Sequence, residues 1–279
     1  MRKIHVDEIT KTVRDLAIRA NTDLGQDVLD AFKRAVETET SPIGRDILQR
    51  LIENAGVANK EKIPMCQDTG MAIVFVEIGQ DAHIVGGALK DAVDEGVRRG
   101  YADGFLRKSV CHPFTRTNTG DNTPAVLHLE LVEGDGFKIE MMSKGFGGEN
   151  MSRVTLLPPS AGIEGIRETV LERVQEAGPN PCPPTIVGVG VGGTFEMAAL
   201  MAKKALLRPL GTEHPDLEVA RLEKEWLSEI NRMGIGPQGL GGRTTSLAVH
   251  INYMATHIAS IPVAVNIQCH SSRHKSALL

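Results

Sequence analysis

The sequence predicts an α+β fold, a mixture of α and β structure in which a helical N-terminal third precedes short strands flanked by helices. Two observations support this prediction. From residue 5 to about residue 58, apolar residues recur at the spacing of amphipathic helices. After residue 70, short apolar runs alternate with helical patterns and are separated by turns containing glycine or proline.

The composition is typical of a soluble globular protein, with 279 residues of which 41% are hydrophobic and 24% charged. This length can form one large domain or two lobes. We expect a single catalytic domain over residues 1–279, with a boundary near residues 150–185 if two lobes are present. The net charge of −4 does not favour nucleic acid or an anionic membrane. Without a membrane-length apolar run or a signal peptide, we expect a cytoplasmic protein whose four cysteines are reduced.

Three apolar stripes predict helices in the N-terminal region. Ser41 followed by Pro42 is a typical helix start, a capping side chain before a proline in the first turn. The stripes are Ile9, Val13, Leu16 and Ala17, then Val28, Ala31, Phe32 and Val36, then Ile43, Ile47, Leu48 and Leu51.

The segment from Pro64 to Gly70 carries a thiol, an amide and a carboxylate on consecutive residues, Cys66, Gln67 and Asp68. The flanking proline and glycine predict an irregular, accessible turn. The apolar run over residues 71–78 predicts a buried strand that would hold this turn rigidly. Taken alone, the segment favours an ordinary loop before a strand, in which the cysteine is a small buried hydrophobe.

A helix over residues 83–99 is expected next, and then the adjacent cations Arg107 and Lys108. These are either a solvated basic pair or a clamp for a carboxylate, since arginine offers a planar bidentate fork. Strands over residues 125–132 and 137–142, joined by Glu-Gly-Asp-Gly, predict a hairpin. The glycine-rich residues 143–150 would let the backbone approach a ligand closely, or form a flexible surface loop.

The second half begins with a predicted helix over residues 164–177, after which prolines surround Cys182. A strand then leads into a helix that begins near Thr194. The glycines over residues 188–193 match a dinucleotide fingerprint weakly, because no acidic residue ends a second strand about 20 residues later. We interpret them as a tight turn between strand and helix. A helix over residues 215–233, with Trp226 in the core, and strands over residues 246–253 and 262–268 complete the chain.

Cys66, Cys182 and Cys269 share a context, since each lies at the boundary of a predicted strand. Cys111, between Val110 and His112, lacks that context and is left out. The short cysteine pairs of zinc sites are missing from the sequence. Three widely spaced thiolates suit a four-iron cluster in which one iron has no protein ligand, an arrangement that leaves a coordination position open for Lewis-acid chemistry.

The chain resembles the alpha subunit of the two-subunit class I fumarases and of the L-tartrate dehydratases, and the N-terminal part of the single-chain iron–sulfur fumarases. The motifs occur in family order over most of the chain. They are Cys-Gln-Asp-Thr-Gly at 66–70, Leu-Arg-Lys-Ser at 106–109, Lys-Gly-Phe-Gly-Gly-Glu-Asn at 144–150, Pro-Cys-Pro-Pro at 181–184, Gly-Ile-Gly-Pro-Gln-Gly-Leu-Gly-Gly at 234–242 and Cys-His at 269–270.

The resemblance implies two lobes with a [4Fe-4S] cluster between them, held by Cys66, Cys182 and Cys269. It also implies that Gln67, Asp68 and Arg107 face the substrate, with the backbone near Gly145 alongside. His257, twelve residues before Cys269, matches a histidine placed near the substrate in that family. Without the resemblance, His257 would be interpreted as a packed core residue. Either Asp68 or His257 could then act as general acid or base.

The resemblance further implies hydration of fumarate to (S)-malate, with L(+)-tartrate dehydration as the alternative. A C4 dicarboxylate carries two charges, and few cations lie near the cysteines in the sequence. A separate beta subunit is expected to bring further basic residues, within a higher hetero-oligomer. A non-catalytic iron–sulfur sensor is disfavoured, because a sensor does not need Asp68 and Arg107 beside its ligands.

Overall fold

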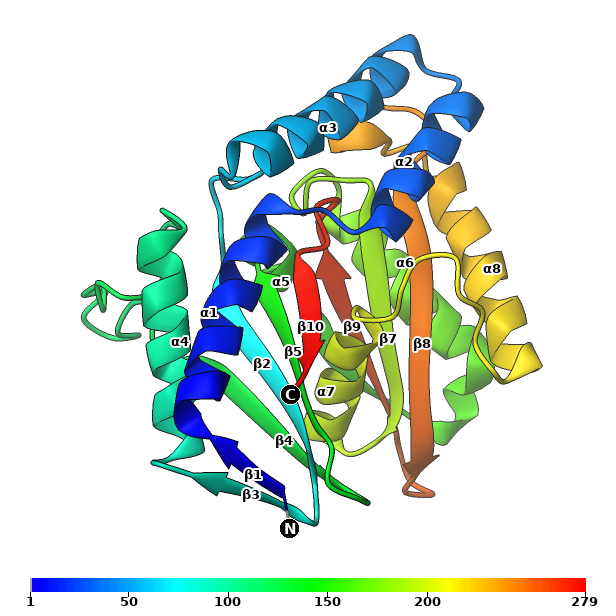
Figure 1. Ribbon diagram of the computed structural model, residues 1–279. Helices are drawn as coiled ribbons and strands as arrows, with labels where there is room; N and C mark the ends of the chain where they lie inside the picture. Colours follow the sequence, from blue (N-terminus) through cyan, green and yellow to red (C-terminus); the bar gives the residue numbers. More distant parts are fainter. Residues whose placement is uncertain (1) are drawn as a thin grey trace. The chain divides into compact units, whose positions relative to one another are not determined.

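The structure is a computed structural model that describes residues 2–279 and confirms a mixed α and β fold with a helical N-terminal part (Figure 1). The chain forms two compact units, each assembled from separate stretches of sequence. Unit 1 contains the described residues up to Gly25, with Asn54–Gly145 and Arg273–Leu279. Unit 2 contains Gln26–Glu53 and Phe146–Ser272. The chain passes from unit 1 to unit 2 after Gly145, and this change of unit is the one nearest to the expected boundary at residues 150–185.

Unit 1 is built on a four-stranded sheet in the order β10-β5-β2-β4. A second, two-stranded parallel sheet pairs β1 with β3. Helices α1 and α4 contact each other and cover one face of the larger sheet (Figure 1). The bounds are β1 Arg2–His5, α1 Val6–Thr22, β2 Met71–Gly79, β3 Ala82–Val85, α4 Leu89–Asp103, β4 Val126–Val132, β5 Phe137–Lys144 and β10 His274–Leu278.

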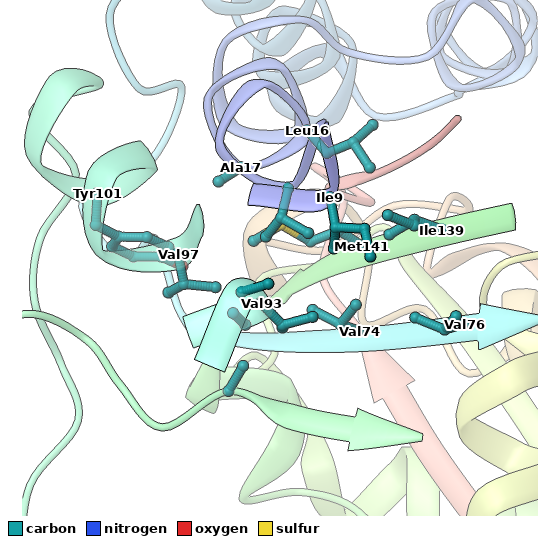
Figure 2. Packing of buried hydrophobic residues seen from close by; sticks show 14 of the residues in the cluster. Ile9, Leu16, Ala17, Val74, Val76, Val93, Val97, Tyr101, Ile139 and Met141 are labelled. Carbon is teal, nitrogen blue, oxygen red and sulfur yellow. The ribbon is translucent and has the colours of Figure 1, made fainter. Parts of the chain in front are cut away.

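The core of unit 1 confirms the first predicted helical stripe. The four apolar residues of that stripe on α1 are all buried. Figure 2 shows three of them, Ile9, Leu16 and Ala17, against side chains of α4, β2 and β5. Helix α4 contributes Val93, Val97 and Tyr101 to the same cluster. Burial of this apolar surface is the main force that fixes the helices on the sheet.

The predicted hairpin over residues 125–142 is wrong in its pairing. Both strands exist, as β4 and β5, but β2 lies between them, pairing parallel with β4 and antiparallel with β5. The glycine-rich connection instead receives hydrogen bonds from the turn after β2, where Gly79 N donates to Gly136 O at 2.8 Å and Asp81 N donates to Gly134 O at 2.9 Å. The turn composition predicts that β4 and β5 pair with each other. Instead, the buried strand β2 pairs with both of them.

The helix predicted over residues 83–99 begins later than expected. Residues Ala82–Val85 form strand β3, and α4 starts at Leu89. The first strand of the chain, Arg2–His5, pairs with β3 and draws this segment into β structure. The tertiary partner thus outweighs the local helical spacing.

Unit 2 contains a four-stranded sheet in the order β6-β9-β7-β8, in which β7 runs parallel to β8 and antiparallel to β9. Helix α7 packs on one face, and α6 and α8 pack on the other, where Trp226 is buried as predicted. The bounds are α2 Gln26–Thr38, α5 Phe146–Glu149, β6 Arg153–Leu157, α6 Gly162–Ala177, β7 Thr185–Gly193, α7 Phe195–Ala205, α8 Leu217–Arg232, β8 Ser246–Thr256 and β9 Ile261–Gln268. Helix α3, Pro42–Glu61, contributes its first part to unit 2 and its remainder to unit 1.

The glycine run of β7 serves packing. An ideal Cβ at Gly188 would lie 2.2 Å from Ala202 O, and one at Gly190 would lie 2.0 Å from Ala198 O. Only glycine allows α7 to approach the strand this closely. The strand-to-helix transition at Thr194, which is the N-cap of α7, confirms the sequence prediction.

Among residues 2–279, we find no helix that is both long enough and apolar enough to cross a lipid bilayer.

Candidate active site

The turn between α3 and β2 is irregular, as the sequence predicts, and several hydrogen bonds hold its backbone in unit 1. Met65 N donates to Asn21 O at 2.9 Å, and Asn54 Nδ2 donates to Met65 O at 2.8 Å. Gly70 has a φ of 69°, and an ideal Cβ there would lie 2.4 Å from Lys144 O. This backbone conformation and this contact both require glycine.

Tyr101 of α4 also holds this turn, and its ring belongs to the buried cluster of Figure 2. Its hydroxyl donates to Thr69 O at 2.7 Å and reaches Gly70 O at 3.1 Å. Burial raises the pKa of Tyr101 to about 12, and the hydrogen bond with Ser143 and the nearby positive charge of Arg273 offset only part of that effect. The phenol is therefore a permanent donor at neutral pH.

Asp68 is half-buried and Gln67 is exposed on this turn. Oδ1 of Asp68 accepts a hydrogen bond from Gly70 N at 3.0 Å, while Oδ2 faces Gly145, where an ideal Cβ would lie 3.2 Å away from it. Two residues predicted from sequence, Asp68 and Gly145, are thus neighbours in unit 1. A side chain at position 145 would crowd this carboxylate, so glycine permits the close approach.

The segment containing Arg107 is fastened to the turn through its backbone. Thr69 Oγ1 donates to Arg107 O at 3.0 Å. The fully buried Asn122 accepts from Ser109 N at 2.7 Å and donates to Gly70 O at 3.2 Å. Arg107 itself is exposed, which leaves its guanidinium accessible to an anion.

Arg273 also contacts the turn that carries Asp68, and it was not identified from the sequence. Its side chain is buried, and Nη1 donates to the main-chain oxygen of Asp68. An ideal Cβ at Gly145 would lie 2.8 Å from Arg273 Nη2. Tyr101, Asn122 and Arg273 come from three distant segments, and no local motif marks them.

In unit 2, Cys182 and Cys269 are positioned at the same end of the sheet. Cys182 precedes β7 and Cys269 follows β9, and Ile186 pairs with Gln268 at this end. His270 links the two segments, because its N donates to Cys182 O at 3.5 Å and its Nδ1 lies 3.0 Å from the same oxygen.

Gln238 reinforces this arrangement from the glycine-rich loop. Its Nε2 donates to Pro183 O at 2.9 Å and lies 3.2 Å from His270 Nδ1.

The loop over residues 234–245 is itself anchored by Glu39, which the sequence did not mark. The carboxylate accepts hydrogen bonds from Arg243 N at 2.9 Å and Thr244 N at 2.8 Å, and from Ser41 N at 2.9 Å. Burial alone would raise the pKa of Glu39, but these backbone donors outweigh it and hold the pKa below its ordinary value.

The donors around the cysteines of unit 2 fit an iron–sulfur ligand set. Cys182 is exposed and Cys269 half-buried, and Ser271 Oγ lies 3.0 Å from Cys269 Sγ, where a hydroxyl can donate to a thiolate. Within either unit, no three histidine, cysteine, aspartate or glutamate side chains of residues 2–279 form a metal-ion site. Cys66 belongs to unit 1, so unit 2 contributes two of the three expected ligands.

The structure does not bring His257 together with these cysteines within the unit. His257 lies exposed in the turn between β8 and β9, and Cys269 follows the other end of β9. Strand β9 has eight residues. At about 3.3 Å per residue, this strand separates the two by about 25 Å.

Comparison with known proteins agrees with the motifs. Residues 10–278 match the family described as fumarate hydratase (fumerase). The chain belongs to this family. A Methanocaldococcus jannaschii protein provisionally named L(+)-tartrate dehydratase subunit alpha is 43% identical over 275 residues, covering 95% of each chain.

Similar relatives occur in bacteria. The L(+)-tartrate dehydratase subunit alpha of Escherichia coli K12 is 35% identical over 278 residues, covering 98% of this chain and 91% of the relative. That of Escherichia coli O157:H7 is 35% identical over 281 residues, covering 98% and 91%. The family and these relatives are named for the addition or removal of water, and the chain is a hydro-lyase component.

Proposed function

We propose that this chain is the alpha subunit of an iron–sulfur hydro-lyase that hydrates fumarate to (S)-malate reversibly. The observation that carries the proposal is the rigid turn of unit 1. In this turn Gln67 and Asp68 follow Cys66 directly, the Asp68 carboxylate lies beside Gly145, and the Arg107 segment is hydrogen-bonded to the turn. Membership of the fumarate hydratase family supports the reaction class.

We propose Cys66, Cys182 and Cys269 as the ligands of a [4Fe-4S] cluster. Thiolates are the usual protein ligands of such clusters. When bound, the cluster would supply one iron without a protein ligand, a Lewis acid for substrate oxygen atoms. Reduced thiols persist in the cytoplasm, so we propose that location for the enzyme.

The residues of unit 1 would bind and orient a C4 dicarboxylate. The exposed guanidinium of Arg107 can bind one carboxylate with two parallel hydrogen bonds and stabilise the charge that develops there. The exposed Gln67 amide and the backbone at Gly145 are proposed to offer further polar groups to the substrate. Asp68 is proposed to hold or move the proton at the carbon that does not receive the hydroxyl.

L(+)-tartrate dehydration is the second candidate, and one observation favours it. The relatives described above, from one archaeon and two strains of a bacterium, are named as alpha subunits of L(+)-tartrate dehydratase. Tartrate has one more hydroxyl group than malate, and the same residues could bind its two carboxylates.

We further propose a separate beta subunit that completes the active site in a higher hetero-oligomer. The names of the relatives, which are alpha subunits, support this. Among the residues proposed to face the substrate, Arg107 is the one cation, whereas the substrate carries two negative charges.

The test is anaerobic co-expression with a candidate beta subunit, followed by assays with fumarate, malate and both tartrates. We expect visible absorbance from the cluster and turnover of fumarate and malate by the complex, with little turnover by the isolated chain. Turnover of L(+)-tartrate alone would establish the second candidate. A cluster-loaded complex that converts none of these acids would contradict the proposed function.

The variant Asp68→Asn tests the proposed proton-transfer role of Asp68 separately from substrate binding. With the cluster intact, we expect kcat to fall by about 10²–10⁴-fold with little change in KM. Full turnover by this variant would remove Asp68 from the proposal.

A further inference from the structure

Arg273 is one of the most deeply buried charged residues of unit 1, with 2% of its surface exposed. It lies four residues after Cys269, at the start of the segment that forms β10. Ser143 N donates to Arg273 O at 2.9 Å, and β10 then pairs antiparallel with β5. The backbone that carries this side chain is therefore fixed on the sheet.

The guanidinium is directed at the Asp68 turn. Nη1 donates to the main-chain oxygen of Asp68, and Nη2 and the Asp68 carboxylate both border Gly145, at 2.8 Å and 3.2 Å from an ideal Cβ there. Nε of Arg273 is buried and has no hydrogen-bond partner. Arginine thus contacts the backbone of Asp68 and places positive charge beside its carboxylate.

This arrangement is costly for stability alone. Burying a guanidinium loses much of its hydration, and a buried donor without a partner adds to the cost. Asn122 and Tyr101 already satisfy the carbonyl groups of Thr69 and Gly70 without any charge. A neutral side chain would hold the turn at lower cost, so the charge points to the carboxylate of Asp68.

We propose that Arg273 is the positioning residue for Asp68. Its Nη1 fixes the Asp68 backbone by a hydrogen bond, and the positive charge at Nη2 holds the carboxylate next to Gly145. Asp68 therefore meets the substrate in one orientation. This inference rests on the proposed function, because it assigns Asp68 the proton at the reacting carbon. Arginine suits this task better than lysine, since the two Nη atoms of its planar fork can contact the Asp68 backbone and border Gly145 at the same time.

The experiment uses the cluster-loaded complex with its beta subunit and compares Arg273→Gln, Arg273→Lys, Asp68→Asn and the double variant Arg273→Gln/Asp68→Asn. We expect Arg273→Gln to lower kcat by about 10²-fold, the typical cost of a misplaced group, while KM changes by less than about 3-fold. Arg273→Lys should recover part of this loss. In the Asp68→Asn background, Arg273→Gln should add little further loss, because the two residues act as a unit.

Arg173→Gln is the matched control, since Arg173 is also buried but pairs with Glu176 in unit 2 at 3.0 Å. Its kcat should stay unchanged. Cluster absorbance and the affinity for succinate, a saturated C4 dicarboxylate that cannot react, should be equal in the unsubstituted and Arg273→Gln complexes.

Three results would overturn the inference while leaving the proposed function intact. They are an unchanged kcat in Arg273→Gln, a KM raised by more than about 3-fold or weakened succinate binding in that variant, and fully multiplicative effects of Arg273→Gln and Asp68→Asn. If Arg273→Gln does not fold, the same comparisons apply to Arg273→Lys, which should retain its KM and lose about 10-fold in kcat. An unsubstituted complex without hydro-lyase activity would instead contradict the proposed function.

Discussion

The hydroxyl of Tyr101 donates a hydrogen bond to the main-chain oxygen of Thr69 at 2.7 Å, and this bond fastens helix α4 to the turn that carries Asp68. The phenol ring lies in the apolar core while its oxygen reaches the site. The core of unit 1 is therefore connected directly to the candidate catalytic turn. Removing the hydrogen bond between Tyr101 and Thr69 should lower both stability and turnover.

Tyr101→Phe tests this connection. The variant keeps the packed ring but leaves the buried Thr69 carbonyl without this donor. We expect the free energy of unfolding to fall by about 1–3 kcal/mol in urea denaturation, and kcat to fall by about 10-fold. Tyr253→Phe is the control, since its hydroxyl donates to Asp216 at 2.8 Å in an exposed position. It should change the free energy of unfolding by less than about 0.5 kcal/mol.

The pH dependence of this contact follows from the raised pKa of Tyr101. The folded-state pKa of about 12 lies above the ordinary value of 10.0, because burial disfavours the phenolate. The protonated phenol therefore contributes its full stability below pH 10, and this contribution is lost as the pH rises towards 12. The unsubstituted chain should lose stability over this window more steeply than Tyr101→Phe. Parallel stability curves of the two proteins would contradict the assignment.

Gly70→Ala should be among the most damaging single-methyl substitutions in unit 1. The new Cβ would lie 2.4 Å from Lys144 O at a φ of 69°. We expect a loss of more than about 3 kcal/mol in the free energy of unfolding, since strain and overlap add. Gly120→Ala is matched in backbone angle, at φ 82°, but its Cβ would meet nothing within 4 Å. It should cost only about 1 kcal/mol, and equal losses in both variants would show that the contact with Lys144 is unimportant.

The sequence predicted the elements of this fold better than their pairing. The helical stripe of α1, the helix start near Thr194 and the buried Trp226 depend on local spacing, and all three are confirmed. The partner of β5 is β2, which is distant in the sequence. The turn residues between β4 and β5 could not indicate this pairing, so the hairpin predicted from them was wrong. Strand β10 was missed because His274–Leu278 has little apolar character and becomes a strand through its pairing with β5.

The same distinction applies to the site. Gln67, Asp68 and Gly145 lie in contiguous motifs and could be named from the sequence. Arg273 contacts Asp68 across 205 positions of sequence. Its neighbours Ser271 and Ser272 are polar, so the sequence does not indicate burial here, although all three residues are buried in the structure. Spacing cannot reveal such a contact, because only the folded sheet brings the two segments together.

Glu39→Gln should loosen the glycine-rich loop of unit 2. The amide keeps the size of the side chain but exchanges an acceptor oxygen for an NH₂ group that faces backbone donors. We expect the free energy of unfolding to fall by about 1–3 kcal/mol at neutral pH. The neighbouring Glu37 is exposed, so Glu37→Gln should be nearly neutral in the same denaturation assay.

The pH profile of Glu39 has the opposite sign to that of Tyr101. Backbone donors hold its folded-state pKa below the ordinary value of 4.5. The ionised carboxylate therefore contributes stability above pH 4.5, and this contribution is lost as the pH falls through the folded-state pKa. The difference between the unsubstituted chain and Glu39→Gln should narrow below pH 4.5. A difference that stays constant down to pH 3 would show that the charge of Glu39 is not the stabilising feature.

The predicted role of His257 as a general acid or base depends on where this residue lies. Strand β9 separates it from Cys269 by about 25 Å within one copy of the chain. A proton-transfer role at the cluster site therefore requires that the exposed turn between β8 and β9 be contributed by a second copy. We expect His257→Asn to lower kcat by about 10²-fold or more with the cluster intact, whereas His83→Asn, at another exposed histidine, should leave kcat unchanged.

Mixed assemblies distinguish the two geometries. When Asp68→Asn and His257→Asn chains are co-expressed with different tags and the mixed complex is purified, a histidine from the second copy leaves one site with both residues intact. That assembly should recover roughly half of the full activity if it contains two alpha chains related by a two-fold axis. If both residues served the same copy, each site would lack one of them and no activity would return. Full activity of His257→Asn alone would remove the histidine from the mechanism and leave Asp68 as the proposed proton carrier.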